Sequence, residues 1–134
     1  MEPVTRVSVH ITDDNSNFRR ALADVLEASS LFNIVGESAS GEEAVEIVGR
    51  LRPEVVVMDL NMPGGMDGIE ATRQVRELWP DATVVLVSTL RSNELPTAVG
   101  TCGAIGYVPK DKLTPDALFS LWAQSVRSRG KAGP

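Results

Sequence analysis

Short apolar runs of strand length recur along the chain, and segments with a different apolar spacing separate them. Five of these runs are rich in valine and isoleucine, which favour extended strands. They span residues 6–11, 32–38, 54–59, 83–88 and 105–109. The third and fourth runs are apolar almost throughout, which is typical of strands that helices cover on both faces of a parallel sheet. The pattern therefore predicts five strands in one parallel sheet.

The segments between these runs carry apolar residues at the three- and four-residue spacing of helices. Three such sets are Phe18, Leu22, Val25 and Leu26, then Ala44, Ile47, Val48 and Leu51, then Ile69, Val75 and Leu78. Two helix starts are marked as well. Asp67 with Glu70 resembles a capping box, and Thr114 before Pro115 is typical of an N-cap followed by proline at the first helical position.

The segment between the fourth and fifth strands has the weakest helical pattern. A helix is expected near residues 92–102, but Pro96 and Gly100 within it favour a short or mobile element. Along the chain as a whole we expect five βα units. It is therefore predicted to fold as a single α/β domain with a doubly wound parallel sheet.

Composition and charge narrow the class of protein. The chain has 134 residues, a net charge of −5 and 43% hydrophobic residues, which suits one domain with a proper core. The N-terminus lacks a positively charged region followed by an apolar stretch, and no apolar run approaches the length of about 18 residues that spans a membrane. We therefore expect a cytoplasmic protein with no membrane partner.

The acidic balance argues against direct nucleic-acid binding by this chain. Only the end, residues 125–134, is locally basic. We assign residues 1–128 to the domain and residues 129–134 to a flexible basic tail or a truncated linker. The single cysteine, Cys102, excludes an internal disulfide and is interpreted as a small buried residue on a helix. The single histidine, His10, is interpreted as a buried or half-buried strand residue.

Charged and hydroxyl side chains stand where the predicted strands end. Asp13 and Asp14 follow the first strand, Asp59 ends the third, Ser88 ends the fourth, and Lys110 follows the fifth. Doubly wound sheets bind ligands outside the carboxyl ends of their strands, so these side chains are expected to converge. Three crowded carboxylates repel one another unless a cation compensates their charge. Oxygen donors without His or Cys favour Mg²⁺, with Mn²⁺ as an alternative.

A site of this kind suits phosphoryl chemistry. Magnesium takes few carboxylates and keeps positions for phosphate oxygens, and a carboxylate can itself act as the nucleophile and form an aspartyl phosphate. Each residue alone has an ordinary explanation: Asp13 and Asp14 favour turns, and Lys110 could be a surface lysine. Their joint placement at one edge of the sheet favours a functional site.

These motifs resemble the receiver domains of two-component response regulators. The matching residues are the pair Asp13 and Asp14, Asp59 in VVVMDLNMPGGMDG, Ser88 after VVLV, and Lys110 at the end of GYVPK. The resemblance covers about residues 4–128. It implies a flavodoxin-like fold with strand order 2-1-3-4-5.

The resemblance also implies roles for individual residues. Asp59 would be the phosphoacceptor, and the phosphoryl group would come from a sensor histidine kinase or a phosphotransfer protein. Asp13, Asp14 and Asp59 would bind Mg²⁺ together with the backbone carbonyl of Asn61. Such a protein assists its own phosphorylation and dephosphorylation but is not expected to turn over an external substrate.

Phosphate binding and switching follow from the same resemblance. Ser88, the backbone N–H of Thr89 and Lys110 would bind the phosphoryl group. Ser88 and Tyr107 would form a conformational switch: as Ser88 moves inward, Tyr107 turns from exposed to buried. This change would remodel the surface made by the fourth helix, the fifth strand and the last helix. A homodimer through that surface on phosphorylation is plausible.

Several functions stay open on the sequence alone. The chain is interpreted as part of, or derived from, a DNA-binding transcriptional regulator, with a stand-alone receiver and a phosphorylation-independent receiver-like binding module as alternatives. A flavin- or nucleotide-binding module would require a glycine-rich phosphate-binding loop after the first strand, where this chain has TDDNSN. A phosphatase with an aspartate nucleophile would normally carry a second acid where this chain has Asn61.

Overall fold

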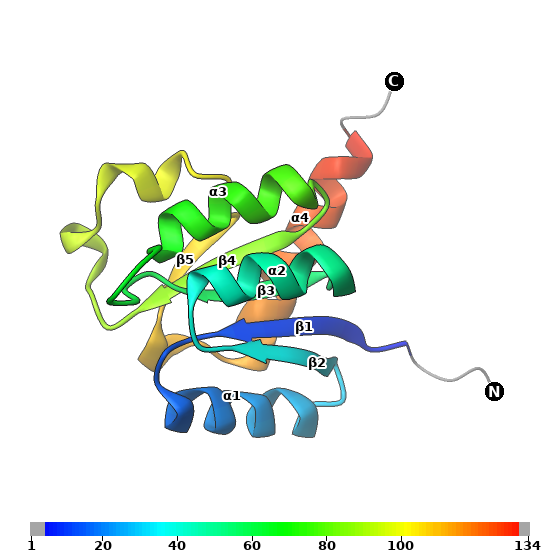
Figure 1. Ribbon diagram of the computed structural model, residues 1–134. Helices are drawn as coiled ribbons and strands as arrows, with labels where there is room; N and C mark the ends of the chain where they lie inside the picture. Colours follow the sequence, from blue (N-terminus) through cyan, green and yellow to red (C-terminus); the bar gives the residue numbers. More distant parts are fainter. Residues whose placement is uncertain (1–4, 132–134) are drawn as a thin grey trace.

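A parallel sheet of five strands forms the centre of the structure (Figure 1). The computed structural model describes residues 5–131. The strands are β1 (Val7–Thr12), β2 (Phe32–Ser38), β3 (Val55–Asp59), β4 (Thr83–Ser88) and β5 (Gly106–Pro109). Their spatial order is β2-β1-β3-β4-β5, and each neighbouring pair is parallel. The predicted doubly wound fold and its strand order are confirmed.

Four α-helices cover the two faces of the sheet. They are α1 (Ser16–Ala28), α2 (Gly41–Leu51), α3 (Gly68–Leu78) and α4 (Pro115–Lys131). Side chains of α2 and α3 pack on one face, and those of α1 and α4 pack on the other. Both predicted helix starts are confirmed, because the Asp67 side chain accepts the Glu70 N–H and the Thr114 hydroxyl accepts the Ala117 N–H.

The connection from β4 to β5 contains no α-helix. Two short 3₁₀-helices, η1 (Ser92–Glu94) and η2 (Thr97–Gly100), stand where the sequence predicted a helix near 92–102. Pro96 lies between them, and proline both lacks an N–H and clashes with a preceding helical turn. Of the five expected βα units, the fourth therefore has no α-helix, and the short element that Pro96 and Gly100 indicated is confirmed. Cys102 is buried as expected, but it lies in the turn after η2 and not on a helix.

The two central strands explain why their sequences are apolar throughout. Every residue of β3 and β4 is buried, and successive side chains face opposite layers. The helices are less completely buried than their apolar spacing indicates. Val25, Leu51 and Leu78 are 49%, 50% and 52% exposed. Leu51 and Leu78 are the last residues of their helices, so they lie at the ends of the helix contact with the sheet.

The last helix extends past the boundary expected at residue 128. It continues to Lys131, so residues 129–131 of the expected tail are helical. Residues 132–134 lie outside the described part of the chain. Among the described residues, no helix is both long and apolar enough to cross a membrane.

His10 lies fully buried in β1 inside a small polar network, as predicted for a strand residue. Its Nε2 lies 2.8 Å from the Ser38 hydroxyl, and its Nδ1 lies 3.2 Å from the Thr12 hydroxyl. Both ring nitrogens therefore have partners without any carboxylate. Burial lowers the pKa of His10 to about 4, because the charged imidazolium would lose its hydration.

This neutral histidine makes stability depend on pH between about 6.5 and 4. The unfolded chain takes up the proton near pH 6.5, whereas the folded chain resists protonation until about pH 4. The unfolded state therefore binds more protons in this interval. The stabilisation is fully present above pH 6.5 and is lost as the pH falls, by about 3 kcal/mol at most.

Urea unfolding of the wild type and of His10→Gln between pH 4.5 and pH 7 measures this effect. His10 is the only histidine of the chain, so the difference between the two profiles isolates its titration. The free energy of unfolding of His10→Gln should fall less steeply towards low pH. Parallel profiles would contradict a buried neutral His10.

Candidate functional site

Three carboxylates and one ammonium meet at the carboxyl edge of the sheet. Asp13 and Asp14 follow β1, Asp59 is the last residue of β3, and Lys110 follows β5. One oxygen from each of the three carboxylates lies within 4.8 Å of the others. Lys110 Nζ lies 2.7 Å from Asp13 Oδ2 and 3.7 Å from Asp59 Oδ2. The structure thus brings together the charged residues that the strand ends pointed to.

Burial makes this cluster electrostatically unusual. Asp13 and Asp59 are buried, whereas Asp14 is exposed. Burial, the largest cause, and the neighbouring Asp13 carboxylate together raise the pKa of Asp59 to about 7, although the Lys110 ammonium opposes the rise. At neutral pH the protein therefore holds an incompletely compensated negative charge at this edge.

Lys110 is held in place from two sides. Besides its contact with Asp13, its Nζ lies 4.6 Å from the centre of the Phe18 ring, within range of a cation–π interaction. Phe18 belongs to the first turn of α1, which begins after its N-cap Asn15. The ammonium is thus fixed between the first helix and the first strand, although it comes from the last strand.

Helix α3 fixes the backbone behind Asp59. Gly68 begins this helix, and its N–H donates to the Leu60 carbonyl at 3.0 Å. A Cβ at position 68 would overlap the carbonyl oxygen of Asp59, so only glycine allows the helix to approach this closely. The end of β3 is therefore clamped at the residue that carries the central carboxylate.

Ser88 and Asn61 lie beside the carboxylates. Ser88 is buried, and its hydroxyl oxygen accepts the Leu90 N–H at 3.2 Å and an Asn61 side-chain N–H at 3.4 Å. The backbone N–H of Asn61 donates to Asp59 Oδ1 at 3.4 Å. Thr89, the next residue after Ser88, is exposed.

Tyr107 reaches from β5 to the loop after β4. Its hydroxyl lies within hydrogen-bond distance of the carbonyl oxygens of Ser88 and Leu90. Its ring is partly buried and packs against the core formed with α2 and α3. The pKa of Tyr107 is raised, mainly by burial. In this structure the tyrosine thus ties the β4 loop to the edge strand.

The carboxylate cluster fits a hard divalent cation. Asp13 Oδ2 is buried and has no aligned hydrogen bond among the described residues, although the Lys110 ammonium is close enough to be its charge partner. The donors that the cluster offers are all carboxylate oxygens. Such a set suits Mg²⁺ or Mn²⁺ and is a poor choice for zinc or copper.

Sequence reasoning missed two residues of α1 that support the site. The Arg19 guanidinium donates to the Asp13 carbonyl at 2.5 Å, and Phe18 lies against Lys110. A signal was available in Asn15, which caps α1 and accepts the Phe18 N–H. A helix that starts there places residues 18 and 19 in its first turn, next to the end of β1.

Comparison with known proteins points to one family. Residues 9–121 match the family model of the response regulator receiver domain. The chain is 35% identical over 127 residues to the transcriptional regulatory protein DegU of Brevibacillus brevis, which covers 95% of this chain and 52% of DegU. It is 39% identical over 124 residues to protein-glutamate methylesterase/protein-glutamine glutaminase 4 of Myxococcus xanthus, which covers 91% and 35%.

A solved structure supports the same similarity. A two-component response regulator of the LuxR family from Aurantimonas has a TM-score of 0.78 and 28% identity, and the match covers 91% of this chain and 86% of that one. The chain spans about half of DegU and about a third of the Myxococcus protein. One of these relatives is named as a transcriptional regulator and the other as an enzyme.

The crowded carboxylates predict that Asp59→Asn stabilises the fold when divalent cations are removed. The folded-state pKa of Asp59 is raised, so the folded chain binds more protons than the unfolded chain between about pH 4 and pH 7. The free energy of unfolding of the wild type therefore decreases as the pH rises from about 4 to 7. Asp59→Asn should be more stable than wild type at pH 8 by on the order of 2 kcal/mol, and the difference should shrink at pH 5.

Denaturant unfolding in EDTA at pH 5 and pH 8 measures this difference, and added Mg²⁺ should reduce it at pH 8. Asp24→Asn is the matched control, since Asp24 is an exposed carboxylate on α1 outside the cluster. An equal effect of Asp59→Asn at both pH values would show that the carboxylates do not repel one another.

Proposed function

The chain belongs to the response regulator receiver domain family, and from this membership we propose that Asp59 accepts a phosphoryl group in a magnesium-dependent reaction. The observation that carries the proposal is the position of Asp59. Its carboxylate stands at the end of a buried strand, beside two further carboxylates and 3.7 Å from the Lys110 ammonium. A carboxylate whose backbone is fixed in this way can attack a phosphorus atom with little change in its own position.

The proposed donor is the phosphohistidine of a sensor histidine kinase or a phosphotransfer protein. An Asp59 carboxylate oxygen attacks the phosphorus, the new O–P bond forms as the P–N bond breaks, and the released imidazole takes up a proton. Asp13, Asp14, Asp59 and the backbone carbonyl of Asn61 would hold Mg²⁺. When bound, the cation neutralises the charge that carboxylates and phosphoryl oxygens bring together.

Three groups of this chain would bind the phosphoryl oxygens. Lys110 supplies a positive charge and already lies between two of the carboxylates. The Ser88 hydroxyl oxygen accepts hydrogen bonds from Leu90 and Asn61, so its own proton is left to donate. The backbone N–H of the exposed Thr89 would be the third donor. One positive charge combined with hydrogen-bond donors favours phosphate over a neutral ligand.

The proposed switch joins Ser88 to Tyr107. When the Ser88 hydroxyl turns to the phosphoryl group, the loop that it holds through Leu90 changes its contacts. The Tyr107 hydroxyl is bound to the carbonyls of that same loop, so it follows. Phosphorylation thereby shifts the population of two arrangements of the surface made by η1, η2, β5 and α4.

That surface is the proposed contact with the output. The similarity to DegU supports a role in a DNA-binding transcriptional regulator, with a phosphorylation-dependent homodimer through the same surface. A stand-alone receiver and a phosphorylation-independent binding module are the alternatives. We place the protein in the cytoplasm, where its kinase partner would act, and assign it no turnover of an external substrate.

Intact mass after incubation with acetyl phosphate and Mg²⁺ tests the phosphoacceptor. Wild type should gain one phosphoryl group, while Asp59→Asn and wild type in EDTA should gain none. Asp24→Asn, which keeps the cluster intact, should behave as wild type. No gain in wild type with either acetyl phosphate or a phosphorylated kinase would favour the phosphorylation-independent module.

The proposed switch predicts that Tyr107 changes its environment on phosphorylation only when Ser88 carries a hydroxyl. The chain has one tyrosine, so ¹³C-labelled tyrosine gives one set of ring resonances. These should shift in phosphorylated wild type, and the shift should fall to half or less in Ser88→Ala that is phosphorylated to the same extent. Thr89→Ala keeps its backbone N–H and should retain the shift. A full shift in Ser88→Ala would show that the change at Tyr107 does not depend on the Ser88 hydroxyl.

A further inference from the structure

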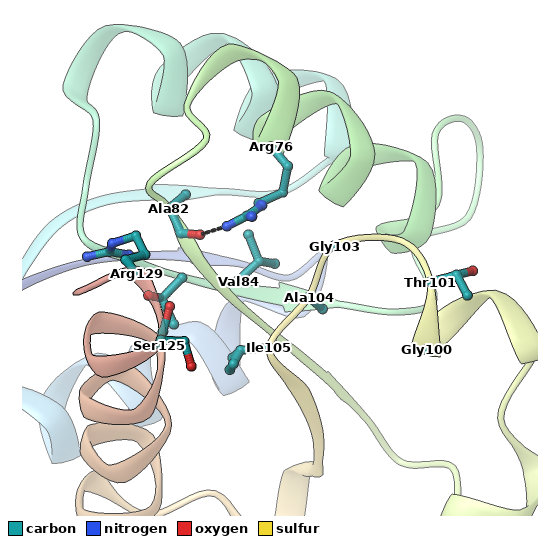
Figure 2. Close-up of a pocket in the computed structure, with 12 residues that line it drawn as sticks. Arg76, Ala82, Val84, Gly100, Thr101, Gly103, Ala104, Ile105, Ser125 and Arg129 are labelled. Atoms are coloured by element: carbon teal, nitrogen blue, oxygen red, sulfur yellow. Dashed lines mark hydrogen bonds between the residues drawn. The ribbon is translucent and has the colours of Figure 1, made fainter. Parts of the chain in front are cut away.

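A second pocket lies at the opposite edge of the sheet, beside the amino ends of β4 and β5 (Figure 2). Its volume is about 480 Å³, and α3, β4, the chain before β5 and α4 all contribute to its walls. Thr83 lines this pocket and begins β4, whereas Ser88 ends the same strand. At roughly 3.3 Å per residue, about 17 Å separates the pocket from the carboxylate cluster.

Two guanidinium groups stand at one side of this pocket. Arg76 donates to the Ala82 carbonyl at 2.6 Å, and Arg129 donates to the Asp81 carbonyl at 2.7 Å. Because these carbonyls belong to consecutive residues, helices α3 and α4 each bring one positive charge to the same turn (Figure 2). Each guanidinium has five N–H donors, and its hydrogen bond to the turn uses only one of them.

The surroundings leave much of this positive charge uncompensated. Asp81 is the acidic residue at the turn, and its Oδ1 lies 3.9 Å from Arg129 Nε, at the outer limit of an ion pair. The side chains of both partners are well exposed, so water weakens their attraction. Arg76 is held more firmly. Gly103 has a φ of +104°, and a Cβ there would lie only 3.1 Å from Arg76 Cγ.

A buried hydroxyl of the pocket lacks a partner. Thr83 is 1% exposed, and its Oγ1 has no hydrogen-bond partner among the described residues. An unpaired buried hydroxyl is unfavourable, because the group has lost its hydration without compensation. Ser125 is buried on α4, and its neighbour Ser128 lies one turn closer to Arg129; both line the same pocket. The pocket thus combines cationic groups with hydroxyl donors.

We propose that this pocket binds a small phosphate-bearing molecule. The phosphoryl group would lie between Arg76 and Arg129 and accept a hydrogen bond from the Thr83 hydroxyl. Because that hydroxyl is buried, the pocket wall would open slightly to admit the phosphoryl oxygen. The body of the ligand would lie against the partly exposed apolar side chains of Ala104 and Ile105, which also line the pocket.

Charge and size favour this class of ligand. A phosphate monoester carries a charge of about −1.5 to −2 at pH 7, which matches two guanidinium groups better than a single carboxylate does. A volume of about 480 Å³ lies within the usual range for small-molecule sites. This site is independent of the proposed phosphorylation of Asp59.

NMR titration with inorganic phosphate tests the proposal. The full chain is ¹⁵N-labelled and kept free of divalent cations, so that the carboxylate cluster repels anions. Phosphate should produce saturable shifts at the Arg76 Nε–H and at the amides of Thr83, Ser125 and Ser128. Sodium chloride at matched ionic strength should produce none. Sodium acetate should bind at least about tenfold more weakly, because it carries half the charge.

Variants distinguish a built site from general attraction to arginine. Arg76→Gln and Arg129→Gln should each weaken phosphate binding by about tenfold or more. Arg73→Gln is the matched control on α3, since Arg73 is exposed and pairs with Glu70 away from the pocket; its phosphate affinity should equal that of wild type. Because Arg76→Gln also removes the hydrogen bond to the Ala82 carbonyl, Arg129→Gln on the exposed rim provides an independent test.

Thr83→Val separates ligand binding from a purely structural role. Valine has nearly the shape of threonine and no hydroxyl, so the variant should unfold at a higher temperature than wild type without phosphate and bind phosphate more weakly. The proposal would be overturned if phosphate produced no shifts, or if chloride or acetate produced equal ones. It would also be overturned if the phosphate shifts persisted in both arginine variants. Unchanged phosphate affinity in Thr83→Val would show that the Thr83 hydroxyl does not bind the phosphoryl group.

Discussion

Repulsion between buried carboxylates at the ends of β1 and β3 is the constraint on which the rest of the domain depends. Asp13 and Asp59 can lie together only because Lys110 arrives from β5 and approaches both. The order β2-β1-β3-β4-β5 places β3 at the centre and next to β1, whereas β5 lies beyond β4, so Lys110 reaches across the end of β4 to both carboxylates. The sheet topology therefore determines the charge balance at this edge, because the strands that form the core also position the charged side chains.

The sequence predicted most of this arrangement because its signals are local. Continuous apolar runs mark β3 and β4, whose side chains are covered on both faces, and Asp67 and Thr114 mark helix starts through their own side chains. Between β4 and β5, two short 3₁₀-helices replace the expected helix, and Pro96 had already indicated a short element there. Apolar spacing also could not show that Leu78, the last residue of α3, is 52% exposed.

The pocket at the amino ends of the strands could not have been predicted in this way. Arg76, Thr83 and Arg129 belong to three elements, and neither arginine stands in a motif. The folded chain brings them together because α3 and α4, on opposite faces of the sheet, both end beside the turn that precedes β4. The clustering of the carboxylates follows from strand ends alone, whereas this cluster requires the packing of helices.

The absence of an α-helix between β4 and β5 has an energetic consequence. The hydrogen bonds within η1 and η2 are local, and Leu95 and Val99 are only partly buried against the core. This connection can therefore rearrange as a small cooperative unit of its own while the hydrogen bonds of the central strands stay intact. Because opening this connection costs far less free energy than global unfolding, a small difference in free energy is enough to shift it between two arrangements. A difference of about 1.4 kcal/mol changes the ratio of two such arrangements tenfold.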